Sequence, residues 1–479
     1  MKERKWWKDA VVYQVYPKTF CDSNGDGVGD IKGITSKLDY LADLGIDVIW
    51  LSPVYKSPME DNGYDISDYY DINPMFGTME DMDELIAEAK KRKIRIIMDL
   101  VINHTSSEHE WFKLSRQGVE PYKDYYYWSD KPNNWTGFFG GKTWEYDEMR
   151  GQYYLHLFAP GQPDLNYYCP EVLEEVKKIL RFWLDKGIVG FRCDVINIIW
   201  KDSLANGKPS LILTGSEHYL TLDGTHKILR ELNDIFEEYD AMTVGETVFV
   251  DTKDAWMLTA PERHELSMVF GFEHMETDQI IVKWFRTKFH WSKFMKVIDK
   301  WQREVPWNTI YLENHDQPRS ISRFGDESDE CAKLMATLLL TLKATPFIYQ
   351  GEERGMKNLP FKCIDDIEDV ESKNVYKILR GLHIPHKFAW KCIMGGSRQH
   401  ARAMIDWSSN NEAIHSYYKE MIKTHHENSE LRNGDFQLLE TSDEYSKYRR
   451  GKMIIQLNHS SDSHRGLAPW ETKITRIDD

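Results

Sequence analysis

The stretch 188–195, IVGFRCDV, decides the fold, because its apolar residues run almost without a break into Arg192 and Asp194. Near-continuous apolar strands are buried on both faces, as in a parallel sheet covered by helices. Just before it, apolar residues at 176, 179, 180, 183 and 184 mark one face of a helix, and Gly187 is expected to end that helix. The segment therefore predicts a helix followed by a buried parallel strand.

The same unit recurs along the chain. Apolar residues at 82, 85, 86 and 89 mark a second helical face, which precedes another apolar strand. The candidate strands are Val11–Pro17, Val48–Val54, Ile94–Val101, Ile188–Val195, Met242–Glu246, Leu266–Phe270, Thr309–Glu313 and Pro346–Gln350. Eight strand–helix units predict an α/β fold, a (β/α)8 TIM barrel with insertions. A doubly wound open sheet is the alternative, but no Gly-x-Gly-x-x-Gly follows the first strand.

Two segments depart from this rhythm. Residues 104–171 are rich in Tyr, Trp, Gly, Asn and Asp, which predicts a small, partly β insertion domain after the third strand. Near the C-terminus YYKEMIK is helical in pattern, and DFQLLE and KMIIQLNH resemble antiparallel strands. We therefore predict a barrel over 1–103 and 172–408, an insertion domain over 104–171, and a helix with a short β-rich domain over 409–479.

Composition excludes several functions. The 61 Lys and Arg residues against 77 Asp and Glu give a net charge of −16, which argues against nucleic-acid and anionic-membrane partners. The six cysteines form no Cys-x-x-Cys pair, which fits a reducing compartment and excludes a thiolate zinc cluster. We see no signal peptide and no apolar run approaching the ~20 residues of a membrane span. We expect a cytoplasmic, monomeric protein.

Acidic residues gather at the predicted strand ends, which in a barrel form the catalytic face. Asp99 ends the third strand, Asp194 the fourth and Glu246 the fifth, and Asp316 follows the seventh. Two carboxyl groups are the minimum set for breaking a glycosidic bond, one as nucleophile or base and one as acid. Arg192, two residues before Asp194, points to the same side of its strand and is expected to keep Asp194 ionised.

Four motifs carry a resemblance to a known family. DLVINH (99–104), GFRCDVIN (190–197), VGE (244–246) and ENHD (313–316) resemble, in order, the signature regions of the α-amylase family, glycoside hydrolase family thirteen. QPDLN (162–166) resembles its additional region. The chain is most similar to the oligo-1,6-glucosidase and dextran glucosidase branch, through DSNGDGVGD (22–30), SPMEDNGYDISDYYDI (57–72) and MVFGFEHME (268–276).

The resemblance implies roles for individual residues. Asp194 is implied as nucleophile, Glu246 as acid/base and Asp316 as transition-state stabiliser, in a reaction that retains configuration. The implied substrate-binding residues are His104, Arg192 and His315 around the sugar, Tyr64 stacked on it, Asp61 and Arg402 at its outermost hydroxyls, and Phe158 and Gln162 in the pocket wall. Asp61 and Arg402 are implied to close the pocket, which makes the enzyme exo-acting.

The implied function is an exo-α-glucosidase that releases glucose from short α-glucosides. Val195, directly after the nucleophile, resembles the residue of α-1,6-acting members, so isomalto-oligosaccharides are the expected substrates. A trehalose-6-phosphate hydrolase and a sucrose isomerase are the alternatives within the family; Lys201 and Lys208 are the candidate phosphate ligands of the former. A non-catalytic sugar- or partner-binding barrel is the alternative outside it, although all three carboxylates are present.

The loop 22–30 predicts a structural cation. Oxygen-bearing side chains alternate with glycines, a pattern suited to wrapping a hard cation, although the full EF-hand loop is absent. The resemblance implies one Ca²⁺ or Mg²⁺, remote from the chemistry, which itself needs no cofactor. Its expected ligands are Asp22, Asn24, Asp26, the carbonyl of Val28, and Asp30.

The chain departs from the family late in the sequence. Relatives have Asp-Asn-Ala-Arg followed by Thr-Pro, whereas this chain reads QHARAMIDW over 399–407. SSNNEAIHSYYK follows at once, where relatives carry an extended loop at the rim of the active site. We therefore expect a more open pocket, with comparable rates on isomaltose and on longer isomalto-oligosaccharides.

Overall fold

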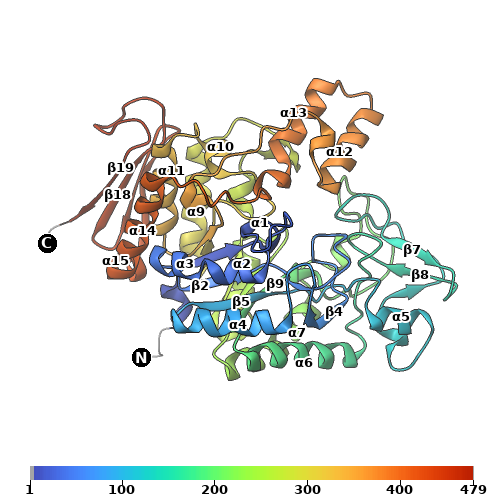
Figure 1. Ribbon diagram of the computed structural model, residues 1–479. Coiled ribbons are helices and arrows are strands. Elements are labelled where there is room, and N and C mark those ends of the chain that lie inside the picture. Colours follow the sequence, from blue (N-terminus) through green and yellow to red (C-terminus); the bar gives the residue numbers. More distant parts are fainter. Residues whose placement is uncertain (1–4, 478–479) are drawn as a thin grey trace.

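Eight parallel strands form the centre of the protein, which a computed structural model describes over residues 5–477 (Figure 1). Their order is β11-β10-β9-β5-β2-β1-β15-β14, and every neighbouring pair in it is parallel. The strands span Val12–Val15 (β1), Val48–Leu51 (β2), Arg95–Leu100 (β5), Gly190–Cys193 (β9), Met242–Glu246 (β10), Met268–Phe270 (β11), Thr309–Ile310 (β14) and Thr345–Tyr349 (β15). Each falls within or overlaps a predicted strand, so the barrel prediction is confirmed.

The first and last strands of this order bring the sheet close to a closed barrel. The Thr309 hydroxyl on β14 donates a hydrogen bond to the carbonyl of Val269 on β11, at 2.9 Å. Almost every residue of the eight strands is buried, as expected for strands covered on both faces. The surrounding helices are α2 (Ile31–Ser36), α3 (Leu38–Leu44), α4 (Met79–Lys91), α6 (Pro170–Lys186), α7 (Asp223–Glu238), α8 (Thr252–Thr259), α9 (Trp291–Glu304), α10 (Ser320–Phe324) and α11 (Asp329–Thr341).

Local sequence signals set the helix boundaries. Thr78 and Asp81 form a reciprocal capping box at the start of α4, which satisfies two backbone N–H groups. Gly187 ends α6 in the left-handed conformation, with φ of 107°, as its sequence position predicts. The buried face of α6 carries the predicted residues, including Ile179 and Trp183. These ends aim each helix back toward the strand that follows it.

An insertion lies between β5 and α6. It contains helix α5 (Glu110–Arg116) and a three-stranded antiparallel sheet in the order β6-β8-β7 (Trp128–Ser129, Gln152–Leu155, Trp144–Asp147). A buried ion pair fixes it to the barrel: Lys201 Nζ lies 2.6 Å from Asp164 Oδ2 and donates to Asn103 Oδ1 at 2.8 Å. The insertion is therefore held firmly over the catalytic face.

Helices follow the last barrel strand and lead to a second sheet. Helices α12 (Val370–Gly381) and α13 (His386–Gly396) form a hairpin that stands above the barrel in Figure 1 and packs on the hairpin of β12 (Gln279–Ile280) and β13 (Val282–Arg286). Helices α14 (Glu412–Glu427) and α15 (Ser429–Asn433) precede the antiparallel sheet β16-β17-β18-β19 (Phe436–Thr441, Tyr445–Arg450, Met453–Asn458, Thr472–Arg476). The helix and two of these strands were predicted; β17 and β19 were not.

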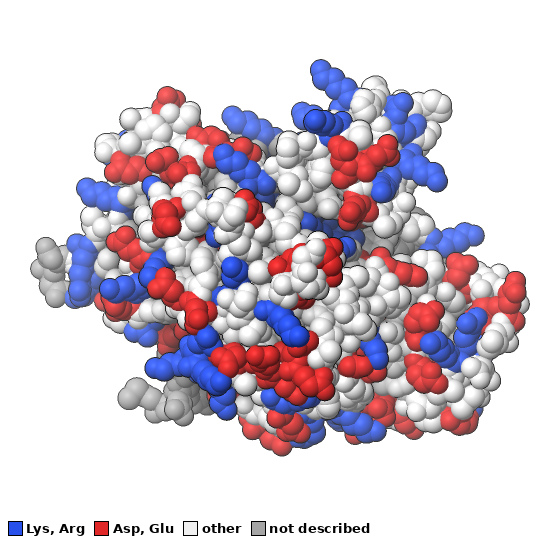
Figure 2. Space-filling view, viewed as in Figure 1, with Lys and Arg blue, Asp and Glu red and all other residues white. Residues whose placement is uncertain are grey.

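Shorter elements complete the chain. Helix α1 (Pro17–Phe20) follows β1, and β3 (Tyr55–Lys56) pairs with β4 (Asp68–Ile72) in a hairpin beside the second strand. On the face shown in Figure 2, acidic and basic side chains are interspersed and form no continuous basic stripe. None of the helices within residues 5–477 is both long enough and apolar enough to cross a bilayer.

Candidate active site

A cavity of about 620 Å³ lies at the carboxyl ends of the barrel strands. Asp194 directly follows β9, Glu246 is the last residue of β10, and Asp316 lies in the loop after β14. The cavity lining contains these three residues together with Asp61, Tyr64, His104, Phe158, Arg192, His315 and Arg402. Gln162 is the one predicted sugar-binding residue that is not in the lining; it is fully buried and bonds to residues that are. The barrel therefore brings the predicted residues together although they are far apart in sequence.

The guanidinium of Arg192 is the centre of the site. Its Nη1 contacts Asp194 Oδ1 and lies 2.7 Å from Asp99 Oδ1, while its Nη2 lies 2.8 Å from Glu246 Oε2. Arg192 is only 2% exposed, so these contacts are shielded from water. One buried cation thus orients three carboxylates that end three adjacent strands.

Two further donors hold the same carboxylates. The indole N–H of Trp50 donates to Asp99 Oδ2 at 2.7 Å. The backbone N–H of Val195 donates to Glu246 Oε2 at 3.2 Å. Val195 has φ of 36°, which is rare for a β-branched residue and marks a locally strained backbone directly after Asp194. This turn aims the Val195 N–H at Glu246.

Burial dominates the electrostatics of the carboxylate cluster. It raises the pKa of Asp99 to about 6, against the opposing effect of Arg192. Burial also raises the pKa of Asp194 above its usual range. Glu246 and Asp99 raise this pKa further, whereas Arg192 lowers it. The sequence-based expectation was that Arg192 keeps Asp194 ionised; Arg192 does lower the pKa of Asp194, but burial and the neighbouring carboxyls outweigh it. Three carboxyls that share one guanidinium tend to retain a proton, and acid catalysis requires one.

His315 is fixed between two polar partners. The Gln14 amide lies 2.8 Å from its Nδ1, and the Tyr64 hydroxyl lies 2.9 Å from its Nε2. The Tyr64 and His315 rings are stacked, with centroids 5.5 Å apart. Burial lowers the pKa of His315 to about 3, so the ring is neutral at pH 7. It therefore acts as a hydrogen-bonding group in this wall of the cavity.

His104 is held in a similar way, also beside Tyr64. Its Nε2 lies 3.1 Å from both the carbonyl oxygen of Tyr64 and the amide of Gln162. Burial lowers the pKa of His104 to about 4, so this ring is also neutral at pH 7. Phe158 packs against it, with ring centroids 5.1 Å apart. Two neutral imidazoles thus face the space between the acidic residues.

Two arginines surround Asp316. Arg402 Nη2 lies 2.6 Å from Asp316 Oδ1, and Arg398 Nη1 lies 3.6 Å from the same oxygen. Burial opposes ionisation of Asp316, yet His315, Arg402 and Arg398 outweigh it and hold the pKa of Asp316 well below its usual range. Asp316 is therefore ionised at every pH at which such an enzyme works.

Arg398, which sequence analysis did not single out, is the arginine that contacts Asp61. Its Nη2 lies 3.5 Å from Asp61 Oδ1, and its Nε is 2.6 Å from Asp369 Oδ1. The expected partner of Asp61, Arg402, instead contacts Asp316 and donates to the carbonyl of His315 at 3.0 Å. Burial raises the pKa of Asp61 to about 6, while Arg398 lowers it. Its closeness in sequence to Arg402, four residues away across a short 3-10 helix, was the available signal.

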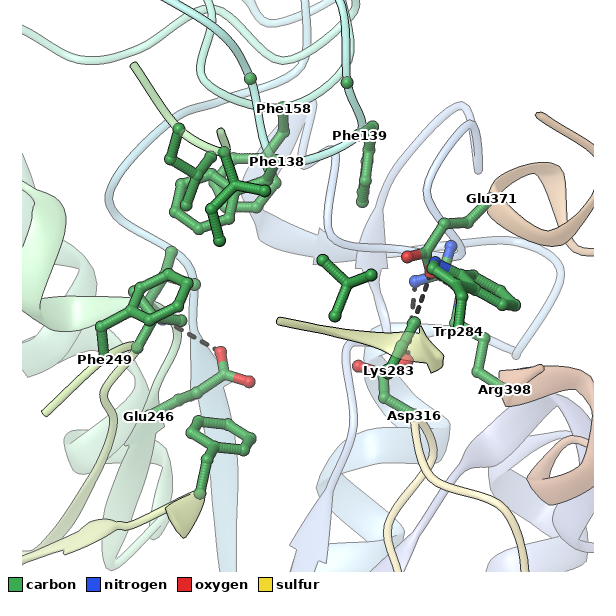
Figure 3. Close-up of a pocket in the computed structure, with 18 of the residues that line it drawn as sticks. Phe138, Phe139, Phe158, Glu246, Phe249, Lys283, Trp284, Asp316, Glu371 and Arg398 are labelled. Atoms are coloured by element: carbon green, nitrogen blue, oxygen red, sulfur yellow. Dashed lines mark hydrogen bonds and ion pairs between the residues drawn. The ribbon is translucent and has the colours of Figure 1, made fainter. Parts of the chain in front are cut away.

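The outer part of the cavity is aromatic. Phe138 stacks on Phe158 with ring centroids 4.8 Å apart, and Phe139 lies beside them (Figure 3). Across the opening, Lys283 Nζ on β13 is 2.6 Å from Glu371 Oε2 on α12. The segment after the last barrel strand therefore contributes directly to the site.

The two candidate phosphate ligands do not form a phosphate site. Lys201 is 1% exposed and is paired with Asp164, as described above. Lys208 is exposed on a loop and is not among the residues that line the cavity. Neither candidate is therefore available as a phosphate ligand in the cavity: Lys201 is buried in an internal ion pair, and Lys208 is not part of the cavity lining.

The cation loop has suitable donors that are turned toward its own backbone. Asp22 accepts N–H groups from Gly25 and Gly27, at 2.7 and 2.8 Å, and Asp30 caps α2 by accepting from Gly33 at 2.6 Å. Within residues 5–477, no three His, Cys, Asp or Glu side chains are placed to hold a metal ion together. The oxygen donors suit a hard cation, and the bound ion remains a prediction.

Comparison with known proteins identifies the class. Residues 14–462 match the catalytic domain of alpha amylase, and the chain belongs to this family of barrel glycoside hydrolases. It is 49% identical to an oligo-1,6-glucosidase of Parageobacillus thermoglucosidasius, over 86% of this chain and 76% of the relative. It is 43% identical to a glucan 1,6-alpha-glucosidase of Streptococcus pneumoniae, over 94% and 89%. The crystal structure of Bacillus licheniformis trehalose-6-phosphate hydrolase superposes with a TM-score of 0.90, at 40% identity, over 95% of this chain and 91% of that one.

The predicted cation gives a stability test. Dialysis against a chelator is expected to release about one Ca²⁺ or Mg²⁺ per chain and to lower the melting temperature, measured by calorimetry with metal analysis. Asp22→Asn is expected to show the lower melting temperature without chelation. Unchanged melting temperature and metal content after dialysis would contradict the prediction.

Arg398 gives a pH test. Asp61 becomes protonated, and loses its charge, as the pH drops through its pKa of about 6. Because the ionised carboxylate is the form expected to bind sugar hydroxyls, kcat/KM is expected to fall over the same pH range. Arg398→Met removes a cation that lowers this pKa and is expected to move the acid limb upward by about one pH unit. In an Asp61→Asn background the same substitution should not move it. If Arg398→Met still shifts the acid limb of the pH profile in the Asp61→Asn background, the limb belongs to another group.

Proposed function

We propose that this protein is a retaining exo-α-glucosidase that releases glucose from short α-1,6-linked oligosaccharides. The observation that carries the proposal is the single buried guanidinium that holds Asp194 and Glu246 beside one cavity, with Asp316 across it. Retaining glycosidases need their two carboxyls about 5–5.5 Å apart, which leaves no room for a water between them. Two carboxyls bound to the two ends of one guanidinium suit that requirement.

The first step forms a covalent glucosyl ester. Asp194 attacks the anomeric carbon while Glu246 gives its proton to the glycosidic oxygen, so that the leaving sugar departs as an alcohol. Asp316, held ionised by its arginines, stabilises the positive charge that develops on the sugar ring. Arg192 contacts both Asp194 and Glu246 and keeps them aligned through this step.

The second step reverses the roles. Glu246, now ionised, removes a proton from water, and the hydroxide oxygen attacks the anomeric carbon. The ester to Asp194 breaks, and glucose leaves with its original configuration. The rings of His104 and His315 are neutral at pH 7, so each has one N–H donor and one nitrogen acceptor. They can therefore donate hydrogen bonds to sugar hydroxyls or accept them in both steps.

The inner end of the cavity supports release of a single glucose. The Asp61 side chain is 12% exposed, contacts Arg398 at 3.5 Å and accepts a hydrogen bond from Gln162 at 3.2 Å. Asp61 and Arg398 can therefore bind the outermost hydroxyls of a terminal sugar in bidentate fashion. Charged groups that bind the outermost hydroxyls of the terminal sugar favour exo-action.

Linkage rests on Val195 and on the relatives. Val195 lines the cavity directly after the nucleophile. The proteins of 49% and 43% identity described above are named for α-1,6 bonds.

A phosphorylated substrate is less well supported. Six carboxylates line the cavity against four cations, and each of those cations contacts a carboxylate. A phosphate would therefore meet a net negative surface whose cations are already paired. This charge balance favours a neutral glucoside over trehalose 6-phosphate.

We further propose that the protein works in the cytoplasm. All six cysteines are free, and five of them are at least partly buried, which fits a compartment that keeps thiols reduced. The single exposed cysteine, Cys363, has no cysteine partner among them. Oligomeric state is a matter for sedimentation, with a monomer expected.

A substrate panel tests the function. Isomaltose and panose are expected to be hydrolysed faster than maltose, and trehalose 6-phosphate and sucrose are expected to be poor substrates, measured as glucose released per unit time. Asp194→Asn is expected to lower kcat on isomaltose by at least 10⁴-fold, because no ester can form.

Glu246→Gln provides the matched control. This variant is expected to slow the hydrolysis of isomaltose strongly, because the leaving sugar needs a proton. The first step with p-nitrophenyl α-glucoside is expected to be little affected, because its leaving group needs no proton. Turnover of trehalose 6-phosphate alone would replace the proposal with its alternative, and conversion of sucrose to an isomer would indicate an isomerase.

A further inference from the structure

The hairpin of α12 and α13 concentrates positive charge on an acidic protein. Residues 372–396 contain five Lys and Arg residues, two His and no Asp or Glu, whereas the whole chain has a net charge of −16. The hairpin projects at the upper right of Figure 1, and Figure 2 shows basic side chains at this corner of the molecule. All five basic residues are exposed: Lys373, Lys377, Arg380, Lys387 and Lys391.

Three large apolar side chains are exposed on the same hairpin. Leu382, Ile378 and Phe388 are 67%, 56% and 50% exposed. Single exposed apolar residues are ordinary, whereas a group of them marks an interaction surface. No residue of 372–396 lines the catalytic cavity, so this surface is separate from the site described above.

The geometry of the hairpin places these three side chains on one face. Leu379 on α12 and Ala389 on α13 are buried in one apolar cluster, so they mark the sides on which the two helices meet. Ile378 and Phe388 each come one residue earlier. Because the two helices run in opposite directions, one step back turns both side chains to the same side of the hairpin. Leu382 follows Ile378 by one helical turn, and its N–H donates to the Ile378 carbonyl at 3.0 Å.

Lysines border this apolar face. Lys391 comes one residue before Cys392, which belongs to the same buried cluster, so Lys391 lies on the face of Phe388. Lys377 and Lys387 directly precede Ile378 and Phe388 in sequence. Helices that lie in the surface of a membrane combine Leu and Phe with Lys and Arg in this way, and clusters of four to eight basic residues recognise anionic lipids.

The composition favours a lipid surface over a protein partner. Four of the five basic residues of the hairpin are Lys, and the interfaces between proteins are depleted in Lys. Lysine is common where helices contact anionic head groups, because its long apolar stem enters the interface while its charge stays in water.

The acidic character of the whole chain does not prevent local attraction. Helix α12 has 12 residues, which gives it a length of about 18 Å. Asp369 and Glu371 lie at its start, about two screening lengths from its tip, since charges are screened over about 8 Å at physiological ionic strength. An anionic surface that meets the tip therefore interacts chiefly with the basic residues.

We infer that the α12–α13 hairpin is a peripheral binding site for anionic lipid membranes. Ile378, Leu382 and Phe388 enter the head-group layer, and the surrounding lysines contact lipid phosphates. This binding function goes beyond the proposed glucosidase activity and does not depend on it. It corrects the expectation, based on net charge alone, that anionic membranes are not partners.

Sedimentation with lipid vesicles tests the inference. The full chain is expected to bind at least tenfold more tightly to phosphatidylcholine vesicles that contain about one-third phosphatidylglycerol than to pure phosphatidylcholine vesicles. Raising the NaCl concentration from 0.1 to 0.5 M is expected to weaken the binding, because salt screens the attraction.

Two triple variants separate charge from apolar contact, and each is expected to weaken binding to the anionic vesicles at least tenfold. The first removes three positive charges and the second removes the apolar groups: Lys377→Gln with Lys387→Gln and Lys391→Gln, and Ile378→Ser with Leu382→Ser and Phe388→Ser. All six positions are exposed, so both variants are expected to fold, and melting temperature checks this.

Matched controls change the same properties elsewhere on the surface. Lys32→Gln, Lys178→Gln and Lys423→Gln together alter the net charge by the same amount, at lysines whose side chains are 66%, 65% and 71% exposed. Met149→Ser with Leu439→Ser removes exposed apolar groups from the insertion and from β16. Both controls are expected to bind the anionic vesicles within about twofold of the unaltered protein.

Three results would overturn the inference. The first is no binding to the anionic vesicles, or equal binding to both kinds of vesicle. The second is binding that the two hairpin variants leave unchanged or that the controls weaken equally. The third is a dimer in sedimentation velocity without lipid that the hairpin variants abolish, which would assign this face to a second copy of the chain. None of these measurements uses hydrolysis, so they stand apart from any test of the glucosidase proposal.

Discussion

The buried guanidinium of Arg192 is the interaction on which the site depends. A cation with 2% exposure is costly to bury unless it is fully paired, and three carboxylates pair it here. Those carboxylates could not lie so close together without it, since like charges in a buried site repel. Removing Arg192 would therefore disturb Asp99, Asp194 and Glu246 at once. The stability of this part of the barrel and the geometry of catalysis have a common origin.

The barrel makes this arrangement possible because adjacent parallel strands end at the same face. Asp99, Arg192 and Glu246 come from β5, β9 and β10, which are neighbours in the sheet. Backbone register places Asp99 directly opposite Arg192. The loops beyond the strands then add groups of different chemistry: the insertion supplies Phe158, and the segment between β15 and α14 supplies Arg398. Rigid strands thus fix the reacting groups, while loops shape the sugar pocket.

The sequence carried enough information for the strands and for the residues that follow them, because apolar runs ending in Asp or Glu are local patterns. All eight barrel strands were predicted from their apolar runs, and four of those runs carry an acidic residue at or near the end. Contacts between distant loops were not predictable, because the sequence around one partner carries no information about the position of the other. Arg398 contacts Asp61 across 337 positions, and Lys201 is neutralised by Asp164 in another domain. Lys201 looks like a surface lysine in sequence, and only the fold shows that it is buried.

The two ends of the cavity obey different physical constraints. Around Asp61 and the arginines, charged groups are paired and oriented, so a ligand that enters would have to exchange its hydrogen bonds with water for equally good ones with these groups. A ligand that leaves one of these partners unpaired would lose affinity. Phe249 and Ile281 line the same cavity and are 56% and 63% exposed, so they offer contact area without directional bonds. The charged groups therefore constrain a ligand by the geometry of its hydrogen bonds, and the apolar groups constrain it by size and polarity.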